Sequence, residues 1–165
     1  MSGLRKNSPG FGIIELVIAS AIISGSLFSL MSVFSLSNRL AGEASNKIRA
    51  NFIAEEGLEA ARILRDAGWN HNIAPLLNSE TYYLDFDTAT LSWDIVTTDP
   101  GFIGGKYSRK IKVQDVSRDS FADIVASGGT VDLESKKIIV EVSWFERGGT
   151  KTQTLSTYLF DVFDN

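Results

Sequence analysis

The sequence contains no cysteine and a single histidine in 165 residues. Without cysteine, a disulfide framework, a thiolate metal site and a cysteine nucleophile are all excluded. With His71 alone, the chain cannot build a catalytic or metal centre on two imidazoles. The net charge of −4, from 16 basic and 20 acidic residues, is not that of a general nucleic-acid binder. We therefore expect no enzyme activity, no cofactor and no metal.

Charge is also missing from the 21 consecutive residues Leu16 to Leu36, which contain no proline either. At about 1.5 Å per residue, a helix of this length is roughly 31 Å long, close to the roughly 30 Å hydrocarbon core of a bilayer. The run predicts a membrane helix. Arg5 and Lys6 precede it and Arg39 follows it, which favours a cytoplasmic N-terminus and the bulk of the chain outside.

One carboxylate, Glu15, lies at the N-terminal edge of this run. An ionised side chain in lipid costs at least about 2.5–3.5 kcal/mol unless it is paired, so Glu15 needs a cation. Upstream of it stands Gly10-Phe11, preceded by the basic residues of a short leader. This arrangement resembles the N-terminal signature of type IV prepilins and of their relatives, the pseudopilins of type II secretion systems.

The resemblance implies a set of processing and assembly steps. Residues 1–10 would be a leader peptide that a prepilin peptidase removes after Gly10, and the new N-terminal residue Phe11 would be N-methylated. Glu15 would then be the fifth residue of the mature chain and would pair with the N-terminal amine of a neighbouring subunit. The implied partners are other pilin subunits, the peptidase and methyltransferase, the membrane and an inner-membrane assembly platform. The implied location is the cytoplasmic membrane before assembly and a filament outside the cytoplasm afterwards.

Two residues depart from the pattern, and other interpretations stay open. Gly12 stands where many members have Thr or Ser, and Pro9 precedes the cleavage site. The missing proline in the apolar run favours a minor pilin or a pseudopilin over a major pilin. The alternatives are a secretory signal peptide with a cut near Ala41, or a plain anchor for an extracytoplasmic binding domain that never polymerises.

Helical patterning continues to Ala67, which predicts one helix over residues 11–67 with its apolar part at about 11–36. One stripe is suited to packing on a sheet, and Gly57 within it suggests a close backbone approach. It comprises Ile53, Gly57, Ala60 and Leu64. A second stripe is either more core or a contact with neighbouring subunits: Ala41, Ala44, Ile48 and Phe52. Gly68 predicts the helix end, and Trp69 a packing anchor.

Residues 68–165 predict a β-rich head packed on the C-terminal half of the helix. Lys137 to Glu146 and Lys151 to Val162 flank a glycine turn and predict a hairpin whose sheet is partly covered on both faces. Ser117 to Ser135 predicts a long loop. The expected fold is therefore α+β, with an antiparallel sheet of four or five strands.

The head offers few candidates for chemistry. His71 is expected in a solvated turn, and four aromatic residues are expected in the core: Trp93, Trp144, Phe145 and Phe160. Two aspartate pairs could donate oxygens to calcium, Asp85 with Asp87 and Asp161 with Asp164, but neither has the dense alternation of acidic residues that a calcium loop carries. A basic cluster predicts a solvated strand face, with nucleic-acid capture possible but not indicated. Its members are Lys106, Arg109, Lys110 and Lys112.

Overall fold

The computed structural model describes residues 10 and 12–163, which form two compact units with their boundary between Ser45 and Asn46. The first unit is the N-terminal part of the long helix α1. The second comprises the rest of α1, the short helix α2 and the β-strands, and it contains the hydrophobic core. This is the α+β class that the sequence predicts.

Helix α1 spans Ile13–Ala67, 55 residues, and its end at Ala67 agrees with the prediction. The expected first residue, Phe11, lies outside the described residues. Helix α1 ends because Gly68 adopts φ 154°, ψ 106°, a conformation that breaks the helical repeat. Helix α2 (Trp69–Asn72) follows at once, and Trp69 is 2% exposed, which confirms it as a packing anchor.

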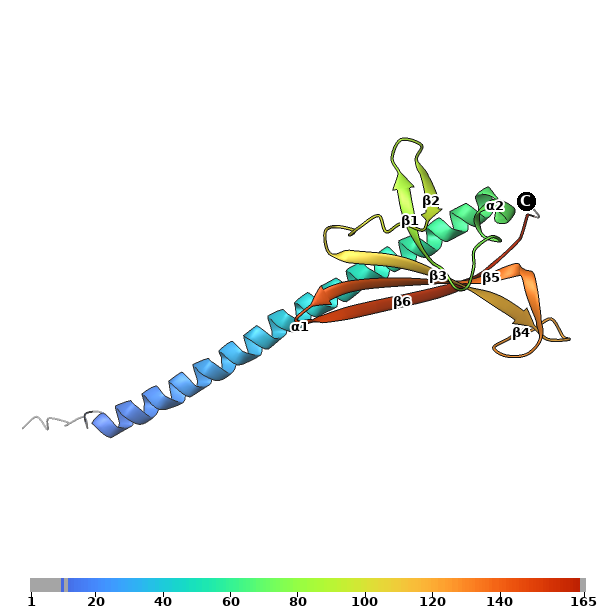
Figure 1. Cartoon of the computed structure of the whole chain (residues 1–165). Helices are drawn as coiled ribbons and strands as arrows, with labels where there is room; N and C mark the ends of the chain where they lie inside the picture. The colour runs from blue at the N-terminus through green and yellow to red at the C-terminus, as the bar shows by residue number, and fades with distance from the viewer. Residues whose placement is uncertain (1–9, 11, 164–165) are drawn as a thin grey trace, which may run out of the picture. The chain divides into compact units, whose positions relative to one another are not determined.

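Six strands form one antiparallel sheet in the order β2-β1-β3-β5-β6, with β4 paired to β3 outside this series (Figure 1). The strands are β1 (Thr81–Asp87), β2 (Ser92–Val96), β3 (Tyr107–Arg118), β4 (Ile124–Val125), β5 (Thr130–Glu146) and β6 (Gly149–Phe160). The expected four or five strands become six because β4, only two residues long, pairs with the end of β3.

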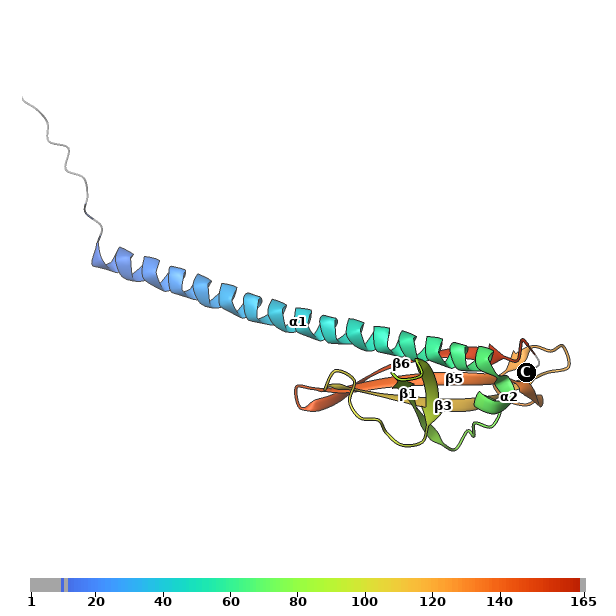
Figure 2. The same ribbon diagram turned by 90° about the horizontal axis from the view of Figure 1, so that it is seen from above.

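Residues 46–67 of α1 lie across one face of the sheet (Figure 2). The predicted stripe of Ile53, Gly57, Ala60 and Leu64 is buried there. It meets the alternate residues of β3 and β5 that point inward, such as Ile111 and Val140, both at most 1% exposed. This contact makes the core of the head.

Gly57 explains how closely the helix approaches the sheet. A Cβ atom at this position would lie 3.0 Å from Cγ1 of Val140 and 3.0 Å from Cδ of Arg109. A Cβ here would therefore require the side chains of Arg109 and Val140 to give way by a few tenths of an ångström, so the close backbone approach inferred from the sequence is confirmed.

The predicted β5–β6 hairpin is also present, with a tighter turn than the four residues expected. Glu146 pairs with Gly149, so only Arg147 and Gly148 form the loop. Both have positive φ, 51° and 77°. Two residues of positive φ are the signature of a type I′ turn, whose twist matches that of the flanking strands.

The prediction of a long loop at Ser117 to Ser135 is wrong. Strand β3 continues to Arg118 and β5 begins at Thr130, with β4 between them. The register of the β3–β5 pairing shifts between Asp115 and Val116, and the two strands pair again beyond the shift. Strand pairing therefore continues into a segment whose polar, glycine-containing sequence is typical of a loop.

The outer face of the sheet is less covered than predicted. Ile138, Val140, Val142 and Trp144 point to the helix and are buried, but Phe145 on the opposite face is 67% exposed. Phe160 is also exposed rather than in the core. Within the described residues, no second layer packs on this face. Trp144 is buried and Trp93 packs at the edge of the core, as expected.

Candidate functional site

Glu15 lies in the first turn of α1 and contacts the backbone at the helix N-terminus. Its Oε2 accepts a hydrogen bond from the backbone N–H of Gly12 at 3.0 Å. Gly12 precedes the first helical residue and is the N-cap, so Glu15 occupies the third helical position. A glutamate there reaches back to the N-cap amide in the capping-box arrangement. It satisfies one of the free N–H groups of the first turn and places its negative charge at the positive end of the helix dipole.

The other half of a capping box is missing. In the full motif a Ser or Thr at the N-cap bonds to the amide three residues later, but Gly12 has no side chain to do so. Glu15 is therefore the one side chain that caps this end within the described residues.

Of the predicted processing residues, Gly10 lies in exposed chain outside any helix or strand. Phe11 lies outside the described residues. The structure thus brings Glu15 to Gly12, the second residue after the predicted cleavage site.

The first unit of α1 exposes a long series of large apolar side chains. Ile14 is 74% exposed, Phe28 76% and Met31 69%. By length and composition α1 is the one helix in the described chain that is apolar enough to cross a membrane. No other described element buries this segment, since the most apolar 18 residues of α1 are 0% buried. Such a surface needs lipid or other helices around it.

Four serines of this segment bond to the helix itself. The hydroxyls of these four donate hydrogen bonds to backbone carbonyls about one turn earlier: Ser20 to Val17, Ser26 to Ile22, Ser29 to Gly25 and Ser32 to Phe28. A polar group without a partner is costly in hydrocarbon, and this local bonding avoids that cost. The small serine side chains also allow close approach of another helix.

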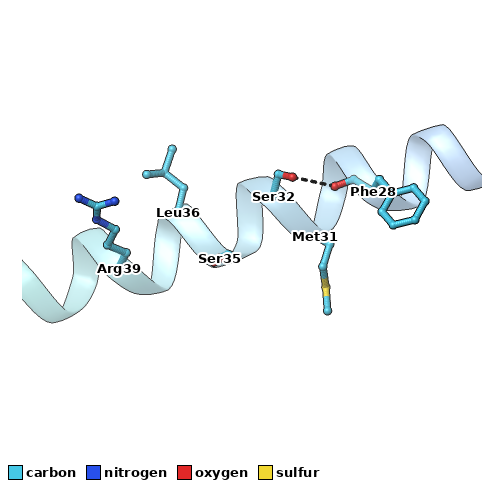
Figure 3. A pocket seen from close by; sticks show the side chains of 6 residues that line it. All are labelled: Phe28, Met31, Ser32, Ser35, Leu36 and Arg39. Carbon is cyan, nitrogen blue, oxygen red and sulfur yellow. Dashed lines mark hydrogen bonds between the residues drawn. The ribbon is translucent and has the colours of Figure 1, made fainter.

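A shallow hollow lies on the same segment (Figure 3). It is lined by Phe28, Met31, Ser32, Ser35, Leu36 and Arg39, all from α1. Since one helix provides every wall and the Ser32 hydroxyl already bonds to the Phe28 carbonyl at 2.9 Å, this is a groove in a helix surface rather than a ligand cavity.

In the head, the basic cluster is divided between the two faces of the sheet. Arg109 alternates in phase with Tyr107 and Ile111 and lies under α1, 6% exposed. Lys110 and Lys112 point to the other face, where Lys112 forms a salt bridge with Glu141 at 3.1 Å. The four residues therefore do not form the single solvated face that was predicted, nor one basic patch for a nucleic acid.

Arg109 instead connects the helix to the sheet. Its Nη1 donates to the Ile53 carbonyl at 3.3 Å and to Glu56 Oε1 at 3.0 Å. Its guanidinium lies 5.1 Å from the centre of the Trp93 ring. The buried Nε has no hydrogen-bond partner within the described chain. A charged residue counted as surface in the sequence is thus part of the core, and its phase with Tyr107 and Ile111 was the signal that could have revealed it.

A second polar cluster that the sequence did not reveal joins β3 to β5. Arg118 Nε donates to Asp132 Oδ2 at 2.6 Å, and its Nη2 donates to the hydroxyl of Ser135 at 3.2 Å. The hydrogen bond from Arg118, followed by that from Ser135, lowers the pKa of Asp132 below its ordinary value of 3.8. This cluster lies beside a hollow of about 430 Å³. Each of the polar groups of this cluster already has a partner in the chain. We therefore interpret the cluster as a structural cross-link between β3 and β5.

No metal centre is formed by the part of the chain that the structure covers: no three His, Asp or Glu side chains lie close enough to share an ion. Of the aspartates proposed for calcium, Asp87 is engaged by the Ala89 N–H and the Thr90 hydroxyl, both at 2.8 Å. Asp164 lies outside the described residues. His71 is exposed, as expected, but it lies in the four-residue helix α2 rather than in an irregular turn.

The second stripe of α1 is exposed, so its interpretation as core is wrong. Ile48 is 58% exposed and Phe52 64%, and Ala41 and Ala44 are also exposed. The geometry therefore leaves two apolar helix surfaces open to contact, the membrane-length segment and this stripe. In comparisons with known proteins, the chain matches no protein-family model, no curated protein and no solved structure.

Proposed function

We propose that this chain is a structural subunit of a type IV pilin-like filament, a minor pilin or a pseudopilin. It is cut after Gly10, N-methylated at Phe11, held in the cytoplasmic membrane by α1 with its head outside the cytoplasm, and then assembled through helix–helix packing. The proposal rests on the resemblance of the segment from Gly10 to Glu15 to the prepilin signature.

The observation that carries the proposal is the position of Glu15. In a plain anchor, an isolated carboxylate at the edge of an uncharged, membrane-length segment would cap the helix, but it would also raise the cost of insertion. Its contact with the Gly12 N–H keeps the carboxylate at the N-terminal end of the helix. Cleavage after Gly10 would create a free amine on Phe11, the residue before Gly12. Such an amine is a cation with which a Glu15 carboxylate can pair.

Pairing between subunits uses this charge. In the family's proposed mechanism, Glu15 of an incoming subunit attracts the N-terminal amine of a subunit already in the filament. Within an apolar bundle of helices such a pair is stronger than in water, while an unpaired buried charge is costly. The pair therefore both attracts the subunit and selects one axial register.

The exposed surface of the first unit supports the same proposal. Its large apolar side chains are exposed within the described chain, and four of its serine hydroxyls are bonded to the helix itself. Both lipid and a bundle of identical helices satisfy such a surface, so the helix is suited to transfer from one to the other.

Substitution of Glu15 tests the function. Glu15→Gln keeps an oxygen that accepts from the Gly12 N–H but removes the charge, and Glu15→Ala removes both. We expect both variants to enter the membrane and to lose incorporation into sheared filaments, because the charge and not the cap recruits the subunit. Glu43→Ala, which removes a carboxylate from the exposed salt bridge with Arg39, is the matched control and should assemble. Normal assembly of both Glu15 variants would contradict the role of Glu15 in recruiting the subunit. Absence of the unmodified chain from sheared filaments would favour the alternative, an anchored binding domain that does not polymerise.

A further inference from the structure

A hollow of about 220 Å³ lies on the sheet, and a row of cross-strand neighbours forms part of its lining. In this row Gln114 of β3 pairs with Lys137 of β5, and Lys137 pairs with Tyr158 of β6. Lys137 alternates in phase with the exposed Phe145, so the row lies on the face of the sheet that α1 does not cover. Cβ atoms of directly opposed residues lie about 4.5–5.5 Å apart, so the three side chains can contact one ligand.

The segment around β4 gives the hollow an apolar side. Ile124 and Val125 of β4, and Ala126 after it, line the same space. Pairing of Val125 with Ser117 holds β4 at the end of β3. An apolar lining with a few convergent polar groups is the composition of a small-molecule site. Since drug-sized ligands occupy sites of about 300–1,000 Å³, this hollow is suited to a single small ring.

The polar side chains of the hollow are free to bind a ligand. Four of them form no hydrogen bond with any residue that the structure describes: Gln114, Ser117, Lys137 and Tyr158. The Lys137 ammonium lies 5.8 Å from the centre of the Tyr158 ring and forms no salt bridge within the described chain. In this respect the hollow differs from the cluster of Arg118, Asp132 and Ser135, whose polar groups are bonded to one another.

The charge of the hollow indicates the charge of the ligand. Asp115 also lines it, but both of its oxygens are engaged: Lys136 donates to Oδ1 at 2.6 Å and Asn78 to Oδ2 at 2.7 Å. Lys136 thus balances the carboxylate of Asp115, and the ammonium of Lys137 is left without a counter-charge among the described residues. A ligand with one negative charge complements this site.

We propose that this hollow binds one acidic sugar unit of the hexuronate class. The Lys137 ammonium receives the carboxylate. The amide of Gln114 and the hydroxyls of Ser117 and Tyr158 both donate and accept hydrogen bonds, as the hydroxyls of a sugar do. The apolar side at Ile124 and Val125 faces the C–H groups of the ring. All of these residues belong to the second unit, so the inference does not depend on the proposed function.

Saturation-transfer difference NMR on the full chain, in a detergent without a sugar headgroup, tests the site with glucuronate as the probe. We expect glucuronate to bind. Lys137→Gln should weaken this binding about tenfold, the order expected for loss of one charge-assisted hydrogen bond. Lys110→Gln is the matched control, because Lys110 lies on the same face of the sheet but does not line the hollow. No glucuronate signal, or an equal effect of the two substitutions, would overturn the inference.

Two further probes separate recognition of the sugar from attraction of an anion. Glucose lacks the carboxylate and should bind about tenfold more weakly than glucuronate, and acetate lacks the ring and should displace glucuronate only in large excess. Tyr158→Phe and Ser117→Ala each remove one hydroxyl from a side chain that is not buried, and each should weaken glucuronate binding about threefold. Equal binding of glucose, displacement by equimolar acetate, or unchanged affinity in both hydroxyl variants would contradict a site for an acidic sugar.

Discussion

Gly57 lies directly against Arg109, so that a Cβ on the glycine would come within 3.0 Å of the arginine Cδ. The arginine cannot easily move away, because its Nη1 is held by the Ile53 carbonyl and by Glu56 and its side chain is 4% exposed. The close approach of α1 to the sheet and the burial of Arg109 therefore depend on each other. Together they fix the position of residues 46–67 of the helix on the sheet.

Gly57→Ala should destabilise the head by about 1 kcal/mol. The gain of up to about 1 kcal/mol in helix propensity is outweighed by overpacking against Arg109 and Val140, which costs about 1–3 kcal/mol. Urea unfolding of the full chain in detergent, followed by tryptophan fluorescence, measures the change. Gly42→Ala is the control, since nothing lies within 4 Å of a Cβ at that position. A head that is more stable with Gly57→Ala would show that the contact is not tight.

Replacement of Arg109 should depend on volume more than on charge. Arg109→Ala removes packing under the helix and should cost about 3 kcal/mol. Arg109→Met fills most of the space, removes the unpartnered Nε and leaves Glu56 in partial contact with solvent, so it should cost less than about 1 kcal/mol. The two unfolding free energies are compared in the same urea assay. An equal loss in both variants would mean that the charge, and not the packing, holds the helix.

Two adjacent glycines at the β5–β6 turn should differ in how much stability the head loses when each is replaced by alanine. Gly148→Ala should destabilise the head by about 1 kcal/mol, because Gly148 has a φ of 77°, which L-residues with a Cβ rarely adopt. Gly149→Ala should have a smaller effect, since Gly149 is not among the residues of positive φ and a Cβ there meets nothing within 4 Å. Thermal unfolding by circular dichroism distinguishes them, and the order of the two melting temperatures is the decisive result.

Acid should weaken the head through two aspartates. Hydrogen bonds from Lys136 to Asp115 and from Arg118 to Asp132 lower both pKa values below the ordinary 3.8. The folded state binds these protons less readily than the unfolded state. The stability they contribute is therefore fully present above pH 3.8 and is lost as the pH falls through the lowered values.

Urea midpoints of the full chain, measured from neutral pH down to below 3.8, should fall with pH in this window, and Asp132→Asn should flatten part of the fall. A slope below pH 3.8 that is the same in the variant and the parent would show that Asp132 does not contribute to it.

Several parts of the fold could be predicted from the sequence because local and long-range signals agree there. The end of α1 at Ala67 combines helix-forming residues with the Gly68 stop, and the β5–β6 hairpin combines alternating apolar residues with a glycine turn. In both places glycine sets the backbone conformation where the element ends, and the pattern of the neighbouring residues sets which face is buried.

The predictions that were wrong concern tertiary context. Arg109 follows the alternation of the buried residues, but its charge suggested solvent, and only the space beneath Gly57 makes burial possible. The strands within Ser117 to Ser135 are maintained by pairing across the register shift at Asp115 and Val116, which no local pattern reveals. Phe145 looked like core but lies on the face that α1 does not cover.

The most direct test of the whole account is the mass of the intact protein and of its N-terminal peptide, taken from its native membrane. The account predicts a mature chain that begins at Phe11 and is heavier there by one methyl group, with residues 1–10 removed. A chain that still begins at Met1 or Ser2, or one cut near Ala41, would contradict prepilin processing and would leave Glu15 without the amine that the assembly mechanism requires.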